Sequence, residues 1–351
     1  MKVLRNILIL LLTLPMVWSC IYDYPEPNFG GTHLELTFIA DTSKMVMYPD
    51  TLDITSESHD IRYVIKAFRM KSSGYFSREA STEFILTKDD INSPDSTMVV
   101  TLEEGYYKFV TLADYVLEGE SADEQYNTSD FNDVSMIYEE YAGNTDTKRA
   151  YVGEQEIDVV RYGSILPIVS DTIRLAPLLT RYQIIATDLD EFIMDRAAAM
   201  KASKTKSTDD TYYGYDLDSV AVDLSKFKLK ITYYPEILFT HIDLLNENNP
   251  IDGEYGVTYY SKISKIDSER ALLGFDYVFI DKHQESIKLR VSVYDEEDNH
   301  ITTIPIDIPV KKGENTEAKG EFLTYVGLEN PDDNGVIINP DYDGEFIIPF
   351  N

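Results

Sequence analysis

The sequence predicts a mainly all-β protein that contains two antiparallel β-sandwich domains in tandem. Short segments in which apolar and polar residues alternate recur from residue 33 to the end of the chain, and this period of two is typical of half-buried strands. These segments follow one another without the intervening helices that parallel strands need. One stretch, 188–201, has helical spacing instead. The length of 351 residues fits two domains of ~100–200 residues each.

The first 19 residues have the features of a secretory signal peptide. Lys2 and Arg5 precede an apolar run, 7–14, that is too short to span a membrane. Cys20 follows a small residue, as in a lipobox, and no second cysteine exists to pair with it. We therefore expect Cys20 to carry fatty acids such as palmitate and to become the mature N-terminus; an incidental or buried cysteine is the alternative. Residues 20–31 contain prolines and glycines and are predicted to form a tether.

The chain is strongly acidic, with a formal net charge of −31 that becomes −33 when residues 1–19 are removed. Such a charge repels nucleic acid and anionic lipid headgroups, so we expect no nucleic-acid partner. The lipid on Cys20 is then the predicted means of attachment to the outer membrane. The mature chain has no disulfide, so its stability must come from cores large enough to do without one.

The predicted N-terminal domain covers residues 32–168. Its first strand alternates cleanly over 34–38, and the second, 61–69, places Ile61, Tyr63 and Ile65 on one face. Segments 98–102 and 106–115 are interpreted as a hairpin that turns at Gly105. The acidic and irregular segment 117–149 is expected to be a surface excursion. Further short strands are predicted at 151–160 and 165–169.

The predicted C-terminal domain covers residues 169–351 and opens with alternating apolar residues over 172–186. A short helix is expected at 188–201, with Asp188 or Asp190 capping its start. The polar run 201–210 has no apolar face and is predicted to be a flexible loop.

The rest of this domain returns to strands. In 227–233 and 287–293, basic side chains occupy alternate positions opposite an apolar set, so the basic residues should face outward. The returning strand 304–310 contains Pro305 and Pro309, which cannot donate to a ladder, so it should be an edge strand or an irregular one. The chain ends with strands near 335–338 and 345–348.

The sequence contains no motif of the common enzyme classes. The five histidines are scattered, and the chain has no HExxH, CxxC, GxSxG or P-loop pattern. Carboxylates are abundant enough to form chance pairs. Asp188, Asp190 and Glu191 could ligate calcium, and 341–345 has part of a calcium loop, but a helix cap and a hairpin turn are the simpler interpretations. We expect no catalytic residue, no metal and no cofactor.

Tyrosine is unusually frequent, with 26 residues. Exposed tyrosines could stack on sugars or anchor a protein interface. The simpler interpretation is that tyrosine fits half-buried positions in a sheet, such as Tyr63, Tyr107 and Tyr233. The mature chain has no tryptophan, which weakens the idea of a sugar-binding platform.

The order of several features resembles that of the fimbrillin-like lipoproteins, which include the major and minor subunits of type V pili. The resemblance covers nearly the whole mature chain. It is carried, after the lipobox and the first strand, by LEEGY at 102–106, ADY at 113–115, IRLAP at 173–177, IPV at 308–310, NT at 315–316, GEFLT at 320–324 and DGE at 343–345.

The resemblance implies two transthyretin-like sandwiches with Greek-key connections. It also implies assembly by strand addition: a protease removes the N-terminal strand of a surface lipoprotein, and a strand from the next subunit fills the groove. In this sequence 33–39 matches the removable strand, and 346–350 a segment that could be donated to another subunit or to a second copy.

One departure from the family concerns proteolysis, which favours arginine in the family. No arginine occurs between Cys20 and Arg62, and Lys44 is the only basic residue in the loop after the first strand. A permanently lipidated anchor, tip or accessory subunit is therefore as well supported as a stalk subunit, with Lys44 the position for proteolytic maturation. The alternative function is a surface lipoprotein that binds a glycan or protein without polymerising.

Overall fold

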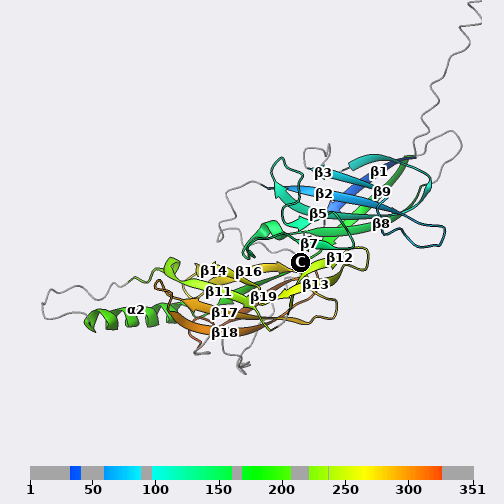
Figure 1. The fold of residues 1–351 in the computed structure, drawn as a ribbon. Coiled ribbons are helices and arrows are strands. Elements are labelled where there is room, and N and C mark those ends of the chain that lie inside the picture. Colours follow the sequence, from blue (N-terminus) through cyan, green and yellow to red (C-terminus); the bar gives the residue numbers. More distant parts are fainter. Residues whose placement is uncertain are drawn as a thin grey trace, which may run out of the picture.

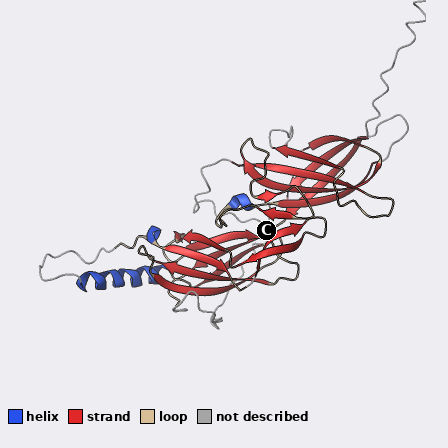
Figure 2. Cartoon of the chain, viewed as in Figure 1, coloured by secondary structure: helices blue, strands red, loops and turns tan. Residues whose placement is uncertain are grey.

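The computed structural model describes most of the chain as strands (Figure 1). The described residues are 32–40, 59–87, 97–159, 168–206, 221–235 and 237–325, of which 32–40, 97–101, 168–170 and 203–206 are described by their backbone alone. Cys20, Lys44 and the segment 346–350 lie outside these residues. The predicted all-β class is confirmed, because strands make up both halves and one long helix accompanies them (Figure 2).

The N-terminal half is a sandwich made from one seven-stranded sheet with the order β3-β2-β5-β8-β9-β1-β4. The sheet turns back on itself where β8 and β9 share only two residue pairs, so that two layers enclose a common core. One layer contains β2 (His59–Arg69), β3 (Thr82–Thr87), β5 (Gly105–Leu117) and β8 (Tyr151–Val159). The other contains β1 (Thr32–Ala40), β4 (Thr97–Leu102) and β9 (Ile168–Pro177).

The C-terminal half is a second sandwich, and its two four-stranded sheets enclose the largest apolar core. One sheet has the order β15-β16-β10-β19, with β10 (Thr180–Ala186), β15 (Ser264–Lys265), β16 (Ala271–Val278) and β19 (Asn315–Gly320). The other has the order β14-β11-β17-β18, with β11 (Lys228–Tyr233), β14 (Thr258–Lys262), β17 (Ser286–Tyr294) and β18 (His300–Pro309). β18, which carries the two prolines, is an edge strand as predicted.

A small fourth sheet joins the two halves. It has the order β13-β12-β7-β6 and combines β6 (Tyr126–Asn127) and β7 (Val134–Met136) with β12 (Ile237–Asp243) and β13 (Asn249–Tyr255). Strands β6 and β7 belong to the segment 117–149, which the sequence predicted to be a surface excursion. That prediction was wrong for its apolar residues, because Tyr126, Phe131 and Val134 are at most 1% exposed. They pack in a core shared by both halves.

Buried polar groups also tie the same segment to the C-terminal half. The carboxylate of Asp276, in β16, accepts hydrogen bonds from Lys148 Nζ at 2.9 Å and from the hydroxyls of Tyr141 and Tyr233, each at 2.7 Å. Lys148 ends a 3-10 turn (Asp146–Lys148). Burial lowers the pKa of Lys148, while the charge of Asp276 opposes this shift. A buried carboxylate is tolerated only when it is paired and hydrogen-bonded, and this network satisfies that condition.

The helix α2 (Leu189–Lys206) is longer than predicted and projects from the end of the C-terminal sandwich (Figure 1). It includes residues 201–206 of the polar run that the sequence predicted to be a loop, because alanine and lysine favour a helix even without an apolar face. Residues 207–210 of that run lie outside the described residues. Near the start of the helix, Phe192 packs in the core of the sandwich and lies edge-on to Phe227. The side chain of Asp188 does not cap the helix amides; it accepts two hydrogen bonds from Thr324. A 3-10 turn (Leu224–Lys226) precedes β11.

Two further sequence predictions differ from the observed pairing. β4 and β5 do not form a hairpin, because β4 pairs with β1, whereas β5 pairs with β2 and β8. A glycine turn specifies that the chain reverses, and here the reversal carries it from one layer to the other. The predicted boundary between residues 168 and 169 lies at the start of β9, but β9 pairs with β1 and the sheets change only after Pro177.

Each half begins and ends with strands that run parallel and side by side. In the N-terminal half β1 pairs with β9 over eight residues, from His33↔Ile168 to Ala40↔Leu175. In the C-terminal half β10 pairs with β19 over six residues, from Arg181↔Asn315 to Ala186↔Gly320. The two halves thus share a closure device that periodicity alone did not reveal. Within the described residues, no helix has the length and apolar character to cross a membrane.

Candidate functional site

The candidate site is the place of β1 in the N-terminal sandwich. β1 is the middle strand of its layer, with β9 on one side and β4 on the other. It pairs in parallel with β9 and antiparallel with β4, from Thr32↔Leu102 to Thr37↔Thr97. Among the strands that the structure describes, β4 pairs with β1 alone. Release of β1 would therefore open the edge of β9 and separate β4 from the rest of the sheet.

The groove that β1 occupies is lined by buried apolar side chains. Its register places Phe38 beside Ile173 and Ala40 beside Leu175, and both β9 residues are at most 1% exposed. Leu102, at the end of β4, is 6% exposed and belongs to the same core. The strand predicted over 34–38 is thus present as β1, and its register sets it beside the buried residues of β9. An empty groove of this kind would expose both backbone hydrogen-bonding groups and apolar surface.

The sequence-predicted site residues lie apart from this groove in the chain. Cys20 and Lys44 are outside the described residues, so their roles stay predictions. Arg62, the first arginine after Cys20, is 1% exposed in β2. Its guanidinium donates to both carboxylate oxygens of Asp114, at 2.9 and 2.6 Å. In the folded chain Arg62 is thus held inside the sandwich, away from a protease.

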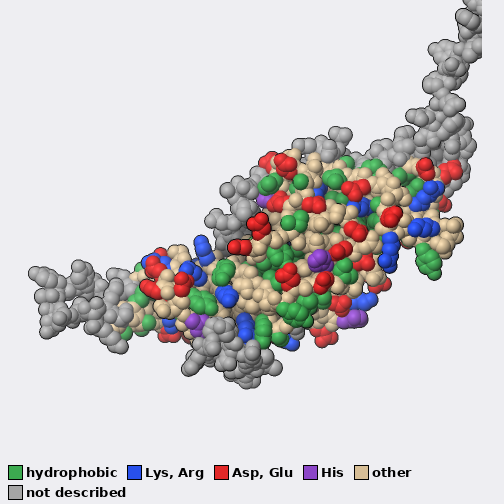
Figure 3. All heavy atoms as spheres, viewed as in Figure 1, with side chains coloured by type: hydrophobic (Ala, Val, Ile, Leu, Met, Phe, Trp, Pro, Cys, Tyr) green, Lys and Arg blue, Asp and Glu red, His purple; other side chains and the backbone are tan. Residues whose placement is uncertain are grey.

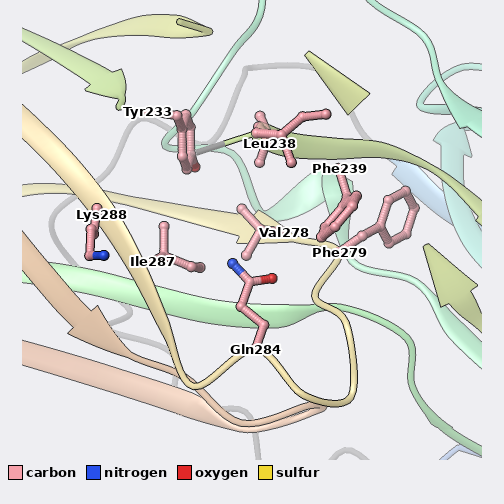
Figure 4. A pocket seen from close by; sticks show the side chains of 9 residues that line it. Tyr233, Leu238, Phe239, Val278, Phe279, Gln284, Ile287 and Lys288 are labelled. Atoms are coloured by element: carbon pink, nitrogen blue, oxygen red, sulfur yellow. The ribbon is translucent and has the colours of Figure 1, made fainter. Parts of the chain in front are cut away.

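Two hollows among the described residues differ greatly in the room that they offer a ligand. The first, enclosed between β12, β16 and β17, has a volume of about 10 Å³, which is room for about one water molecule. Tyr233, Phe279 and Gln284 are among the side chains that converge on it (Figure 4). Gln284 Nε2 donates to the carbonyl of Ser286 at 3.1 Å, so this amide already has a partner within the protein. The pocket is therefore too small for a ligand, and its amide nitrogen is already hydrogen-bonded.

The second hollow is a cleft of about 610 Å³ at the junction of the two halves. The outward face of β8 and β9 supplies Glu154 and Arg174 to its lining. The loop between β12 and β13 supplies Asn246 and Asn248, and the turn before β19 supplies Lys312. Lys312 Nζ donates to the carbonyl of Asn248 at 2.7 Å, and burial lowers its pKa. The size and the mixed lining are those of a small-ligand site. Its lining residues in the described part of the chain include no aromatic side chain.

The tyrosines singled out in the sequence follow the simpler interpretation given above. Tyr63, Tyr107 and Tyr233 are all buried, as expected for strand positions. Tyr75, Tyr255 and Tyr260 are the tyrosines that stand out among the exposed large side chains of the described chain. In the described ranges no cluster of histidine, cysteine or carboxylate side chains is arranged to hold a metal ion.

Sequence reasoning found the strand β1 but missed what surrounds it. Alternation in 34–38 indicated a half-buried strand, and nothing in that pattern tells a central strand from an edge strand. The parallel pairing with β9 joins residues more than 130 positions apart in the chain. Ile173 and Leu175 alternate with polar residues in β9, and the sequence pattern assigned this strand to the C-terminal half.

Comparisons with known proteins give one family and a set of similar structures. The model of a family of unknown function (DUF6562) matches residues 27–350. No curated protein sequence matches the chain.

The similar structures all have low sequence identity. One from Bacteroides thetaiotaomicron, described as a proposed polysaccharide-binding protein (DUF1812), is 10% identical with a TM-score of 0.45, covering 82% of this chain and 90% of that one. The fimbrial anchor protein Mfa2 from Porphyromonas gingivalis is 9% identical with a TM-score of 0.42, covering 82% and 89%. A fimbrial assembly protein from Parabacteroides distasonis is 10% identical with a TM-score of 0.39, covering 82% and 90%.

Proposed function

Since this chain belongs to the DUF6562 family of unknown function, and since its first strand fills the middle of a sheet, we propose that it is a non-enzymatic subunit of a fimbria-like adhesive structure. It acts as a structural, anchor or accessory subunit on the cell surface. Its partners are other fimbrial subunits or further copies of itself, joined by strand addition.

The position of β1 is the observation that carries this proposal. Strand addition needs a sheet in which one strand can be exchanged for an equivalent strand from another chain. β1 provides this because it comes first in the described chain and pairs on both sides. A donated strand with alternating apolar residues would recover the same backbone hydrogen bonds and cover Ile173 and Leu175. The segment 346–350, FIIPF, has the apolar composition that this role requires.

The lipid anchor is the second part of the proposal. Cys20 would hold the chain at the outer membrane for as long as β1 remains covalently attached to it. Cleavage at Lys44 would separate the lipid and β1 from the rest of the chain, which then depends on a donated strand. An uncleaved chain is an anchor or accessory subunit, and a cleaved chain is a stalk subunit.

Mass spectrometry of the mature N-terminus on cells separates these roles. A diacyl or triacyl Cys20 on the mature chain means an anchor or accessory subunit, whereas a start near residue 45 means a polymerising subunit. A soluble chain that begins elsewhere, without lipid, would contradict both.

Strand exchange is tested with a variant that has a specific protease site at Lys44. After cleavage, the fragment that contains β1 is held only by non-covalent contacts. Excess peptide 342–351 should displace this fragment, which then appears in the low-mass fraction of a size-exclusion column. The uncut protein and a peptide with Phe346→Asp and Ile348→Asp are the controls. Retention of the fragment at every peptide concentration would remove strand exchange from the proposal.

The cleft between the two halves favours a second candidate function, a surface lipoprotein that binds a glycan. Its volume of about 610 Å³ suits a short oligosaccharide, and its amide, carboxylate and cationic groups are suitable hydrogen-bonding partners. A glycan array tests this directly. Saturable binding that is lost in Arg174→Ala and retained in an exposed control, Lys71→Ala, would favour the second candidate.

A further inference from the structure

One outer face of the C-terminal sandwich has a charge opposite to that of the whole chain. It belongs to the sheet β14-β11-β17-β18, which lies on the side away from the N-terminal half (Figure 1). Leu229 and Ile231 of β11 are fully buried in the core, so the residues between them and beside them face outward. The register across the four strands then assigns the other outward positions.

The register gives three complete rows and one partial row of outward residues. Reading from β14 to β18, they are Lys262, Lys228, Tyr294 and His300; Tyr260, Lys230, Ser292 and Thr303; Thr258, Thr232, Arg290 and Pro305; and, from β17 to β18 alone, Lys288 and Asp307. We call these residues the outer cationic face.

The composition of the outer cationic face departs strongly from that of the chain. It holds five lysine or arginine residues and one acidic residue, Asp307, whereas the chain has 31 basic and 62 acidic residues. Acidic side chains are spread over both halves on the side of the molecule shown in Figure 3. Lys228 bonds Asp298 at 2.6 Å, but that carboxylate belongs to the turn after β17 and lies at the margin of the face.

The centre of the outer cationic face is covered. Ser292 and Thr303 sit opposite each other on β17 and β18, and their hydroxyls are 2.8 Å apart. They face away from the core, yet Ser292 is 5% and Thr303 0% exposed, and Arg290 beside them is 9% exposed. Small side chains at the middle of a solvated sheet face keep part of their surface in water. Part of this cover comes from neighbouring side chains, because His300 Nε2 lies 2.8 Å from Thr303 Oγ1 and the guanidinium of Arg290 lies over the ring of Tyr234. A segment lying over the face would supply the rest.

The C-terminal segment 326–351 has the matching charge and the right point of departure. It contains six acidic residues and no lysine or arginine. It begins after Tyr325, whose carbonyl accepts a hydrogen bond of 2.7 Å from Thr302 Oγ1 in the edge strand β18. A segment that crosses four strands spaced about 4.8 Å apart must cover about 20 Å, and fewer than ten extended residues are long enough for this. The segment of 26 residues can therefore reach every row.

We propose that residues 326–351 dock on the outer cationic face of the same chain. The acidic side chains pair with Lys228, Lys230, Lys262, Lys288 and Arg290, and the segment lies over Ser292 and Thr303. The docking is inferred from the opposite charges of the segment and the outer cationic face and from the burial of Ser292 and Thr303. Its use rests on the proposed function: the docked form would store the segment 346–350 until another subunit offers a vacant groove.

Lysine reactivity in the full-length monomer tests the docking. Glu329, Asp332, Asp333, Asp341, Asp343 and Glu345 are changed together to Gln or Asn, and acetylation rates are read by mass spectrometry. Lys228, Lys230 and Lys262 should react about fivefold or more faster in this variant than in the parent chain, because several weak ion pairs are lost at once. Lys71, which follows β2, and Lys265, in β15, are exposed lysines outside this face and should not change.

A reciprocal variant tests the same contact from the face. Lys228→Glu, Lys230→Glu and Lys262→Glu should speed hydrogen exchange in 326–351, whereas Lys71→Glu with Lys265→Glu should not. Salt at 0.5 M should have a similar effect on the parent chain, because surface charges are screened. Unchanged lysine rates in the neutralised variant would overturn the proposal and assign the cover to 207–220 or to a second copy. Both readouts use the isolated monomer, so a failed strand-exchange test leaves them unaffected.

Discussion

At the scale of single residues, the N-terminal sandwich contains a buried charge cluster in which every group has a partner. Arg62 binds Asp114 through two hydrogen bonds, and it also donates to Asp123 Oδ1 at 2.8 Å and to the carbonyl of Ser121 at 2.9 Å. Asp123 in turn accepts hydrogen bonds from the amide and the hydroxyl of Thr128. The cluster fixes the start of the segment 117–149 against β2, which helps direct that segment toward the other half.

Asp123 makes the stability of this cluster depend on pH. Burial raises its pKa, but the hydrogen bonds from Thr128 and Arg62 outweigh burial, and the net result is a pKa below the ordinary value of 3.8. A carboxylate with a lowered pKa in the folded state stabilises the fold above pH 4, and this contribution is lost as the pH falls through the folded-state pKa.

We therefore expect Asp123→Asn to lower the free energy of unfolding by about 1–3 kcal/mol at pH 6, because a charged acceptor is lost. The difference between parent and variant should shrink at pH 3.5. Urea denaturation at the two pH values measures it, with Asp158→Asn, in an exposed position of β8, as the control. A difference that stays constant between pH 6 and pH 3.5 would mean that the Asp123 charge contributes nothing.

At the scale of elements, β1 is the strand whose sequence matters most to the N-terminal sandwich. Phe38→Asp places a charge beside buried Ile173, and we expect it to lower the free energy of unfolding by about 3 kcal/mol or more. Thr37→Asp is the matched control, since its partner Thr172 is only half-buried and a loss below about 1 kcal/mol is expected. Chemical denaturation compares the two. Equal losses would show that the register of β1 differs from the one described.

The same scale shows which elements the sequence could predict. Alternation identified β1, β2, β11 and β17, because half-burial leaves a period of two in the residues themselves. Pro305 and Pro309 identified β18 as an edge strand, since the missing amides are a local property.

Pairing between distant strands was not predictable in this way. The turn at Gly105 is a local signal for chain reversal, but the partners of β4 and β5 are set by packing between layers. The acidic residues around Phe131 and Tyr126 led to the prediction of a solvent-exposed segment. The large apolar side chains of these two residues were the signal for a buried position. For the candidate site, the sequence predicted the exchangeable strand, while its central place between β9 and β4 came only from the structure.

At the scale of the whole molecule, the two halves share a core and are expected to unfold together. Phe131 is 1% exposed between them, and its carbonyl accepts a hydrogen bond from the amide of Leu244 at 2.9 Å. Phe131→Ala should cost about 3–5 kcal/mol, whereas Ile137→Ala, an exposed position of the same segment, should cost less than about 0.5 kcal/mol.

Hydrogen exchange shows whether both halves respond. Amides of β2 in one half and of β16 in the other should lose protection together in Phe131→Ala. Loss in one half alone would show that the shared core does not couple them.

The parallel closure of each half has a mechanical consequence. In the proposed role as a lipid-anchored subunit, the chain would be pulled at one end by the membrane and at the other end by its binding partner. In each half the chain enters the first strand and leaves the last strand at opposite ends of a parallel pair, β1 with β9 and β10 with β19. Tension therefore slides these strands along each other and loads all their hydrogen bonds at once, where an antiparallel hairpin pulled from its ends would open bond by bond. The sandwiches are arranged to resist pulling along the axis on which an adhesive filament bears its load.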